Sequence, residues 1–437
     1  MAIKLFKAFT KSVAKDTPKE APVPVVGVIT APNIPDSLVI KELEKGVGSI
    51  SIIRLVELMI YEAFQMRASD IHVEPEQEDL RIRFRIDGVL HDIFAFPKEI
   101  HSEVITRIKV LTGLRTDEHQ MAQDGRFKIK IQNAKDIDIR VSIAPTYYGE
   151  NCVMRLLAEQ SQNLTLESLG FSADNLSRIY NAIKRPHGMI LVTGPTGSGK
   201  STTLYTILTK LNTKEVSIIT IEDPIEYSLP GVDQIQVNER TGLTFAEGLR
   251  FILRQDPNII MVGEIRDDDT ANIAVTAAMT GHLMLSTIHA NDTATTLPRL
   301  IDMKVEPFLI SSTLNIVIGQ RLVRTICTNC KAIRKMSDVE LTALQDYFPP
   351  ELLKKNKFYA GTGCNECNGT GFRSRTGIHE VLEINEEVRD LIMKHANATE
   401  IKKASMKNGM ITMIEDGFQK VMEGVTTIEE VLRVFHE

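Results

Sequence analysis

The residues with the clearest chemistry form one glycine-rich segment that ends in a lysine and a serine. It fits the pattern G-x-x-x-x-G-K-[ST], follows the apolar run Met189–Thr193 and precedes a stretch with helical periodicity. Glycines in this pattern let backbone N–H groups converge on phosphate oxygens, and the helix N-terminus adds a favourable field. We expect Lys200 to reach the β- and γ-phosphates of a nucleotide and Ser201 to bind Mg²⁺. The predicted phosphate-binding residues are Gly194, Pro195, Thr196, Gly197, Ser198, Gly199, Lys200, Ser201 and Thr202.

Two further apolar runs lead to acidic residues. Ile259–Val262 leads to Glu264, the arrangement of a Walker B strand, from whose end Glu264 would reach Mg²⁺ directly or through water. Val216–Ile221 is followed by Glu222 and by two more acids within residues 223–226. Acidic side chains beside a phosphate site can polarise the attacking water of a hydrolysis reaction. Taken alone, such a cluster is more often a solvated loop; for Glu264, the companion phosphate motif argues against a merely solvated acid.

Two histidines, His282 and His289, flank the apolar run Leu283–Ile288. A lone histidine is usually structural. Two that flank a strand beside a phosphate site are candidates to sense the γ-phosphate, and we predict that role for both.

Phosphoryl transfer also needs cations on the γ-phosphate. Arg126 directly precedes a predicted strand, and Arg140 lies on the polar face of the alternating run Ile137–Ile143. From spacing alone, both are most simply solvated arginines on an exposed sheet face.

Four of the five cysteines form two C-x-x-C pairs, separated by 33 residues. Cys327, Cys330, Cys364 and Cys367 therefore predict a tetrahedral Zn²⁺ site. Four cysteine ligands leave no open position, so the metal would be structural rather than catalytic. The alternative is two thioredoxin-like pairs or unrelated thiols, although neither pair opens a helix after a strand. Cys152, the fifth cysteine, is expected to be a small buried residue.

Hydrophobic periodicity predicts the elements that hold these residues. Residues 50–67 and roughly 98–112 have helical spacing, Leu80–Ile86 alternates apolar residues with arginines, and Asp87-Gly88 is a hairpin signal, which together indicate a small α+β domain. From Leu169 to Arg324, short apolar runs alternate with helical stretches, which is typical of an α/β fold with a parallel sheet. The predicted parts are a tail and proline-rich linker (1–48), the α+β domain (49–157), an interdomain linker (158–168), the P-loop core (169–324), a four-cysteine subdomain (325–373) and C-terminal helices (374–437).

Composition excludes several classes of protein. The chain has 437 residues, a net charge of −6 and only five cysteines. A dedicated nucleic-acid binder usually carries a basic excess, and a disulfide scaffold needs more cysteines. No N-terminal segment combines the basic start, apolar core and cleavage site of a signal peptide. We therefore expect a cytoplasmic multidomain protein that does not bind nucleic acid.

The ordered motifs resemble the assembly ATPases of type IV pili and type II secretion, the PilB/GspE family. The resemblance covers the chain from about Ile50 to the C-terminus. Two of its motifs are the Asp box (Ile221–Glu226) and the His box (Thr280–His282 with Ile288–Asn291) of that family. The other matching segments are Ser69–Pro75, Arg85–Gly88, Gln123–Arg126, Arg185–Ser201, Gly263–Asp267 and Gln320–Arg324.

The resemblance implies a PAS-like domain followed by a RecA-like P-loop NTPase domain, with ATP between them. It implies a homo-hexamer that drives a polytopic inner-membrane platform protein, and peripheral association with the inner face of the cytoplasmic membrane through that partner. It also makes Glu222 the general-base candidate and Glu264 the metal-side carboxylate. Arg126 and Arg140 match the family's γ-phosphate arginines. The cysteine pairs favour the assembly branch, because the related retraction motors lack them.

Two other functions fit parts of the sequence. A nucleic-acid translocase or DNA-uptake ATPase would use the same core and cysteine pairs, but the acidic balance and the lack of a basic, aromatic-rich segment weigh against it. A non-catalytic scaffold would bind zinc and nucleotide as structural ligands only, and Cys364–Gly371 does fit the C-x-x-C-x-G-x-G repeat of DnaJ-type chaperones. The intact acidic motifs argue against lost catalysis.

Overall fold

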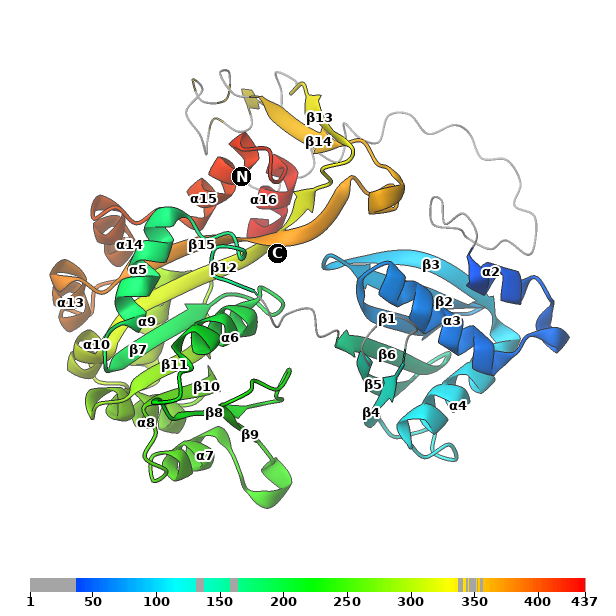
Figure 1. Cartoon of the computed structure of the whole chain (residues 1–437), viewed down its shortest axis with the longest axis horizontal. Helices are drawn as coiled ribbons and strands as arrows, with labels where there is room; N and C mark the ends of the chain where they lie inside the picture. The colour runs from blue at the N-terminus through cyan, green and yellow to red at the C-terminus, as the bar shows by residue number, and fades with distance from the viewer. Residues whose placement is uncertain are drawn as a thin grey trace. The chain divides into compact units, whose positions relative to one another are not determined.

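The computed structural model describes residues 37–130, 137–157, 164–336 and 357–436, together with residues 341, 342, 345, 351 and 353. Residues 1–36 of the predicted tail and linker and residues 158–163 of the interdomain linker lie outside these ranges. The chain divides into a first unit, Met1–Ala158 with Ile326–Ser374, and a second unit, Glu159–Thr325 with Arg375–Glu437 (Figure 1). Within the described ranges, no helix is long and apolar enough to cross a membrane.

A six-stranded antiparallel sheet forms the body of the first unit, in the order β3-β2-β1-β6-β5-β4 (Figure 1). Helices α3 and α4 cover one face, since Leu55 and Met59 of α3 and Ile105 and Ile108 of α4 belong to the same buried cluster as the strands. The elements are α2 (Leu38–Leu43), η1 (Val47–Ser49), α3 (Ile52–Gln65), β1 (Ala68–Pro75), β2 (Asp79–Ile86), β3 (Val89–Pro97), η2 (Lys98–Ile100), α4 (His101–Thr112), β4 (Gln123–Ile129), β5 (Ile137–Thr146) and β6 (Gly149–Leu157).

The local signals in this part of the sequence are confirmed. Alternation in β2 buries Leu80, Ile82 and Phe84 and leaves the intervening arginines on the opposite face. Asp87 (φ 49°) and Gly88 (φ 89°) both adopt the left-handed conformation that a tight hairpin turn needs. The sheet therefore has one apolar face and one face rich in arginine.

The first described helix, α2, lies before the domain boundary predicted at residue 49. Helix α2 follows Ser37, whose hydroxyl caps it by accepting a hydrogen bond from the Ile40 N–H. Ser37 also donates to the Glu62 carboxylate of α3 at 2.9 Å, and Val39 is fully buried. These contacts join the end of the predicted linker to the first domain.

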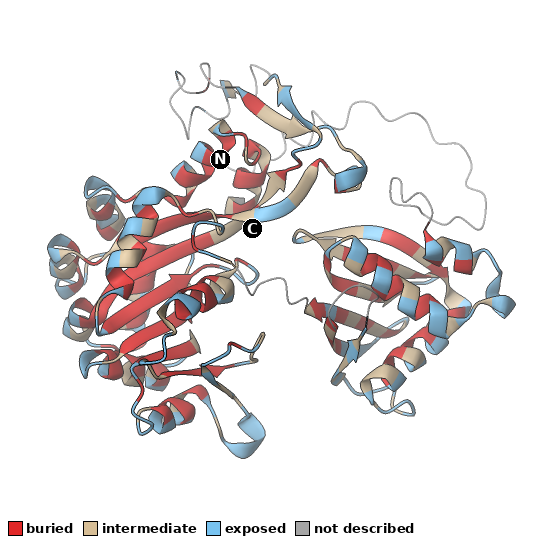
Figure 2. Ribbon diagram, in the orientation of Figure 1, coloured by how far each residue is buried: buried red, intermediate tan, exposed pale blue. Residues whose placement is uncertain are grey.

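A seven-stranded sheet forms the second unit, in the order β15-β12-β7-β11-β10-β8-β9. All neighbouring pairs from β12 to β9 are parallel, as predicted. Strands β7, β8 and β11 are buried throughout (Figure 2), the pattern of a sheet covered on both faces. The strands are β7 (Gly188–Thr193), β8 (Ile218–Glu222), β9 (Asp233–Gln236), β10 (Ile259–Ile265), β11 (Leu283–Ile288), β12 (Leu314–Ile326) and β15 (Phe372–Glu383).

Two groups of helices cover the two faces of this sheet. Ile190 and Val192 of β7 pack with α5 and α6 on one face, while Met189 and Leu191 pack with α7 to α10 on the other. Alternate residues of one strand thus serve two cores. The helices on these faces and the helical turn are α5 (Ala173–Ile183), α6 (Lys200–Leu211), η4 (Glu239–Thr241), α7 (Phe245–Ile252), α8 (Asp268–Met279), α9 (Thr293–Asp302) and α10 (Pro307–Thr313).

The C-terminal part begins with a strand, whereas the sequence predicted helices over 374–437. Strand β15 pairs with β12 at the edge of the sheet, and its residues 377–382 are all buried. The buried run includes His379 and Glu380, and these polar residues interrupt the apolar pattern from which a buried strand is predicted. Helices follow as predicted: α13 (Glu386–Met393), α14 (Ala398–Lys407), α15 (Met413–Met422) and α16 (Ile428–His436).

A buried ion-pair group holds the last helix against β12. Glu430 of α16 accepts hydrogen bonds from the Arg324 guanidinium at 2.6 Å and from the Arg324 N–H at 3.1 Å, and it also pairs with Arg433 at 2.9 Å. Burial alone would raise the pKa of Glu430, but the two arginines outweigh it and lower the pKa to about 2.

We predict that Glu430 makes the stability of the second unit depend on pH. Because its pKa is lowered on folding, the stabilisation is complete above pH 4.5 and is lost as the pH falls toward 2. Glu430→Gln should unfold more easily than wild type by about 3 kcal/mol at pH 7, at ~1.4 kcal/mol per pKa unit. Urea unfolding, followed by circular dichroism, measures the free energy of unfolding of both proteins. The difference between wild type and Glu430→Gln should decrease as the pH falls from 4.5 to 2.

Asp390→Asn, which changes an exposed acid on α13 of the same unit, is the control and should leave the pH dependence of the free energy of unfolding close to that of wild type. A difference in free energy of unfolding between wild type and Glu430→Gln that stays constant across this pH range would contradict the assigned ion pair.

Candidate functional site

The glycine-rich loop joins β7 to α6, at the carboxyl end of a central parallel strand, where ligands of open α/β sheets bind. Gly194 (φ 147°), Gly197 (φ 79°) and Gly199 (φ 85°) take backbone conformations that other residues rarely adopt. The Lys200 ammonium lies over the loop and donates to the carbonyl oxygens of Gly194 and Pro195, both at 2.9 Å. Burial lowers the pKa of Lys200, an effect that the Glu264 charge partly offsets.

This loop fits a phosphate group. Its glycines allow a concave backbone, and Ser201 lies in the first turn of α6, where a helix favours negative charge. The hydroxyl of Ser198 is buried in the loop and has no hydrogen-bond partner among the residues that the structure describes. An anion with several acceptor oxygens would satisfy these donors.

Glu264 and His289 lie together beside this loop. They follow the buried parts of neighbouring strands, β10 and β11, and their side chains are joined by a hydrogen bond of 3.0 Å between Nε2 and Oε2. Arg266 forms an ion pair with the other carboxylate oxygen. Burial opposes ionisation of Glu264, but Arg266 and His289 outweigh it and lower its pKa. Thr193, at the end of β7, fixes the loop after His289 by hydrogen bonds to the Ala290 carbonyl (2.8 Å) and N–H (3.1 Å).

Glu222 ends β8, the next strand along, but its carboxylate is enclosed. The residue is 4% exposed, and its oxygens accept from the Thr220 hydroxyl at 2.6 Å, the Gln234 amide at 3.0 Å and the Tyr205 hydroxyl. Burial and the bond to Glu222 raise the pKa of Tyr205. The two predicted carboxylates therefore differ in kind, because the Glu264 side chain is 13% exposed and faces Lys200, His289 and Arg266.

The structure separates His282 from this group. His282 precedes β11, and its carbonyl accepts from the N–H of Gly188 at the start of β7. It therefore lies at the opposite edge of the sheet from the loop, about 20 Å away for a six-residue strand. The prediction that both histidines sense the γ-phosphate is corrected in this respect, because a strand separates residues that flank it.

The first unit carries a row of arginines on the open face of its sheet. Arg126 pairs in register with Arg140, Arg140 with Arg155, Arg155 with Asp70, and Asp70 with Arg85. Asp70 is 5% exposed and accepts from Arg155 Nε at 2.9 Å, with Arg85 at 3.6 Å. Cross-strand neighbours lie about 5 Å apart, so the row concentrates positive charge suited to a polyphosphate. Sequence reasoning missed Arg155, since only strand register places it beside Arg140.

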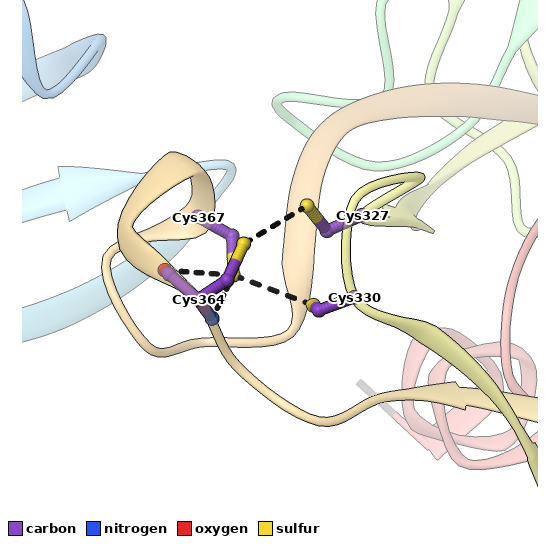
Figure 3. Close-up of side chains that lie close together, drawn as sticks. All are labelled: Cys327, Cys330, Cys364 and Cys367. Atoms are coloured by element: carbon purple, nitrogen blue, oxygen red, sulfur yellow. Dashed lines mark hydrogen bonds between the residues drawn. The ribbon is translucent and has the colours of Figure 1, made fainter.

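The four paired cysteines converge in one cluster (Figure 3). Their sulfur atoms all lie within 4.8 Å of one another, and Cys327–Cys364, Cys330–Cys367 and Cys364–Cys367 are each 3.8 Å apart. A tetrahedral Zn²⁺ with Zn–S bonds of ~2.3 Å requires sulfur separations of about 3.8 Å. The donor set and its spacing therefore fit Zn²⁺ and disfavour two separate thiol pairs.

Short elements and glycine turns hold the cysteine cluster. Cys327 follows β12, and Cys330 leads into β13 (Lys331–Arg334), which pairs with β14 (Phe358–Gly361); η5 (Asn365–Cys367) contains Cys367. Burial opposes ionisation of Cys367, but N–H groups of Cys364 and Gly371 outweigh it and lower its pKa to about 7. Cys152 is fully buried in the first unit, as expected, and burial raises its pKa.

The sequence profile of the family described as "Type II/IV secretion system protein" matches residues 45–433. The chain belongs to this family of secretion ATPases. It is 44% identical over 394 residues to the type IV pilus assembly ATPase PilB of Myxococcus xanthus, which covers 90% of this chain and 69% of that protein. It is 48% identical over 408 residues to type II secretion system protein E of Dickeya dadantii, which covers 93% of this chain and 80% of that protein.

Two solved structures share the fold. The pilus retraction motor PilT with bound ADP aligns with a TM-score of 0.58 and 26% identity, over 87% of this chain and 96% of that one. The Legionella pneumophila ATPase DotB aligns with a TM-score of 0.64 and 22% identity, over 88% and 95%. The mixed α/β fold expected from the P-loop and the preceding α+β domain is thus that of this ATPase family.

We predict one Zn²⁺ per chain in the purified, reduced protein, because four cysteines satisfy a closed tetrahedral site. Elemental analysis should also show that Cys364→Ser loses the metal. Cys152→Ala, which removes the remaining thiol, is the matched control and should keep one Zn²⁺. Well under one Zn²⁺ per chain in the wild-type protein would refute a zinc site.

Proposed function

We propose that this secretion ATPase is a cytoplasmic homo-hexameric motor whose ATP hydrolysis powers assembly of a type IV pilus or a type II secretion pseudopilus. Its partner would be a polytopic inner-membrane platform protein, through which the motor would associate with the membrane. The observation that carries the proposal is the meeting of the P-loop, Glu264 and His289 at one edge of a parallel sheet, in a chain of this family. The likeness to PilB and to type II secretion protein E supports assembly, as does the cysteine cluster.

Each group at the site has a proposed role. The P-loop and Lys200 bind the phosphates, and Ser201 and Glu264 hold Mg²⁺, which supplies charge neutralisation on the β- and γ-phosphates when bound. His289 orients Glu264 through its 3.0 Å hydrogen bond and lies where it can respond to the γ-phosphate. Arg126 and Arg140, with Arg155 added from the strand register, supply the cations for the γ-phosphate. These arginines belong to the first unit, whereas the P-loop, Glu264 and His289 belong to the second.

The general base is assigned to Glu222. Its three hydrogen bonds fix the carboxylate at the end of β8, and one of those donors must give way to the attacking water. A Cβ on Gly263, the residue before Glu264, would lie 3.4 Å from the Cα of Glu222, which is an ordinary van der Waals contact. The paired strands β8 and β10 therefore end side by side, and we assign their two carboxylates separate tasks in one reaction.

Lys200→Ala should keep its fold, but its rate of ATP hydrolysis should fall roughly 100-fold or more, because the substitution removes the positive charge that stabilises the phosphates. Phosphate release with Mg²⁺-ATP measures this, with circular dichroism to check folding. Lys210→Ala is the matched control: this exposed lysine lies at the other end of α6 and contacts Tyr180. DNA should leave the wild-type rate unchanged. A fully active Lys200→Ala protein would contradict the proposal, and strong stimulation of ATP hydrolysis by DNA would favour a nucleic-acid translocase.

Glu222→Gln should bind ATP with near wild-type affinity but hydrolyse it about 10²- to 10⁴-fold more slowly, the usual range for loss of a general base. Glu264→Gln should also weaken the dependence of binding on Mg²⁺, since it removes a metal-side carboxylate. Single-turnover kinetics with a Mg²⁺ titration separates the two. Normal turnover by Glu222→Gln together with an inactive Glu264→Gln would transfer the base role to Glu264.

A further inference from the structure

Gln320 of β12 lies directly beside the phosphate loop. Strand β12 pairs with β7, where Gly319 is in register with Thr193, the last residue before the loop. Gln320 is 2% exposed, which is unusual for a polar side chain and requires that its amide be hydrogen-bonded.

Both polar atoms of the Gln320 side chain form hydrogen bonds, one with the phosphate loop and one with α6. Nε2 donates to the carbonyl of Ser198 at 2.8 Å, and Oε1 accepts from the Thr203 hydroxyl at 2.6 Å. Ser198 lies within the loop and Thr203 in the first turns of α6, so one buried side chain connects the segments on either side of Lys200.

The loop also packs closely on Gln320. A Cβ on Gly194 would lie 2.3 Å from the Gln320 carbonyl oxygen, and a Cβ on Gly199 would lie 2.8 Å from its Nε2. A side chain at Gly194 would collide with the backbone of β12, and one at Gly199 would displace the Gln320 amide. Gln320 thus bounds the loop from outside at its first and last glycine.

We propose that Gln320 is a positioning residue for phosphate binding, an inference that rests on the proposed function of the loop. In a planar trans peptide, the carbonyl of one residue and the N–H of the next point in opposite directions. Holding the Ser198 carbonyl toward Gln320 therefore turns the Gly199 N–H away from β12, to the side of the loop where phosphates bind. Without the bond, that peptide is free to rotate and the ring of N–H donors is no longer set before the nucleotide arrives.

Helix α16 holds strand β12 through contacts outside the phosphate loop. Successive strand residues point to opposite faces, and Arg321 donates to the Val434 carbonyl of α16 at 2.6 Å. Arg324 pairs with Glu430 of the same helix. The position of Gln320 is therefore fixed independently of the loop that it orients.

The test is binding of a fluorescent ADP analogue with Mg²⁺, read as Kd, together with the thermal unfolding midpoint of the nucleotide-free protein. Gln320→Met keeps the side-chain length and removes both hydrogen bonds, so Kd should rise at least tenfold. Gln320→Glu keeps an acceptor for Thr203 but places a carboxylate against the Ser198 carbonyl, so Kd should rise further. Asn315→Ala is the matched control, because this buried amide on the same strand bonds to Arg185 and to the His187 carbonyl instead. Its midpoint should fall, but its Kd should stay within twofold of wild type.

A Kd for Gln320→Met within twofold of wild type would overturn the proposal, as would an equal rise in Kd for Asn315→Ala. If Gln320→Met does not fold, Thr203→Val removes only the hydroxyl that bonds Gln320 and should raise Kd about threefold; unchanged binding would then overturn the proposal. Failure of the wild-type protein to bind nucleotide would instead contradict the proposed function, on which this inference rests.

Discussion

Parallel pairing of β7, β11, β10 and β8 is the constraint on which the site depends. Parallel strands end at the same edge, so the residues that follow each strand meet although they are far apart in sequence. The loop after β7, His289 after β11, Glu264 in β10 and Glu222 in β8 are all placed in this way. Hydrogen bonds from Ser286 and Thr287 of β11 to carbonyls of β10 keep the two middle strands in register.

The edge holds two carboxylates in different surroundings, and the proposed division of roles between them rests on this difference. Glu222 is surrounded by hydroxyl and amide donors, whereas Glu264 meets a histidine, an arginine and the P-loop lysine. In the first unit, strand register aligns Arg126, Arg140 and Arg155, the cations proposed for the γ-phosphate.

Features encoded in short segments could be predicted from the sequence, and features that depend on strand pairing could not. The P-loop, the parallel strands, the Asp87-Gly88 turn and the cysteine pairs are each readable within a few residues. By contrast, Arg155 and Gln320 gain their significance only from neighbours on other strands. The sequence interpretation places His282 beside the phosphate loop, but this residue lies at the opposite edge of the sheet. Two residues that flank a strand are separated by the length of that strand. Strand β15 could not be predicted from hydrophobic periodicity, because polar residues are buried in it.

The most direct test of the account is a structure of the full chain with Mg²⁺ and a non-hydrolysable ATP analogue. The account predicts that the Lys200 ammonium exchanges the Gly194 and Pro195 carbonyls for phosphate oxygens, with Glu264 on the metal side and arginines of the row at the γ-phosphate. Phosphates bound away from the loop, or a γ-phosphate contacted by none of Arg126, Arg140 and Arg155, would contradict it.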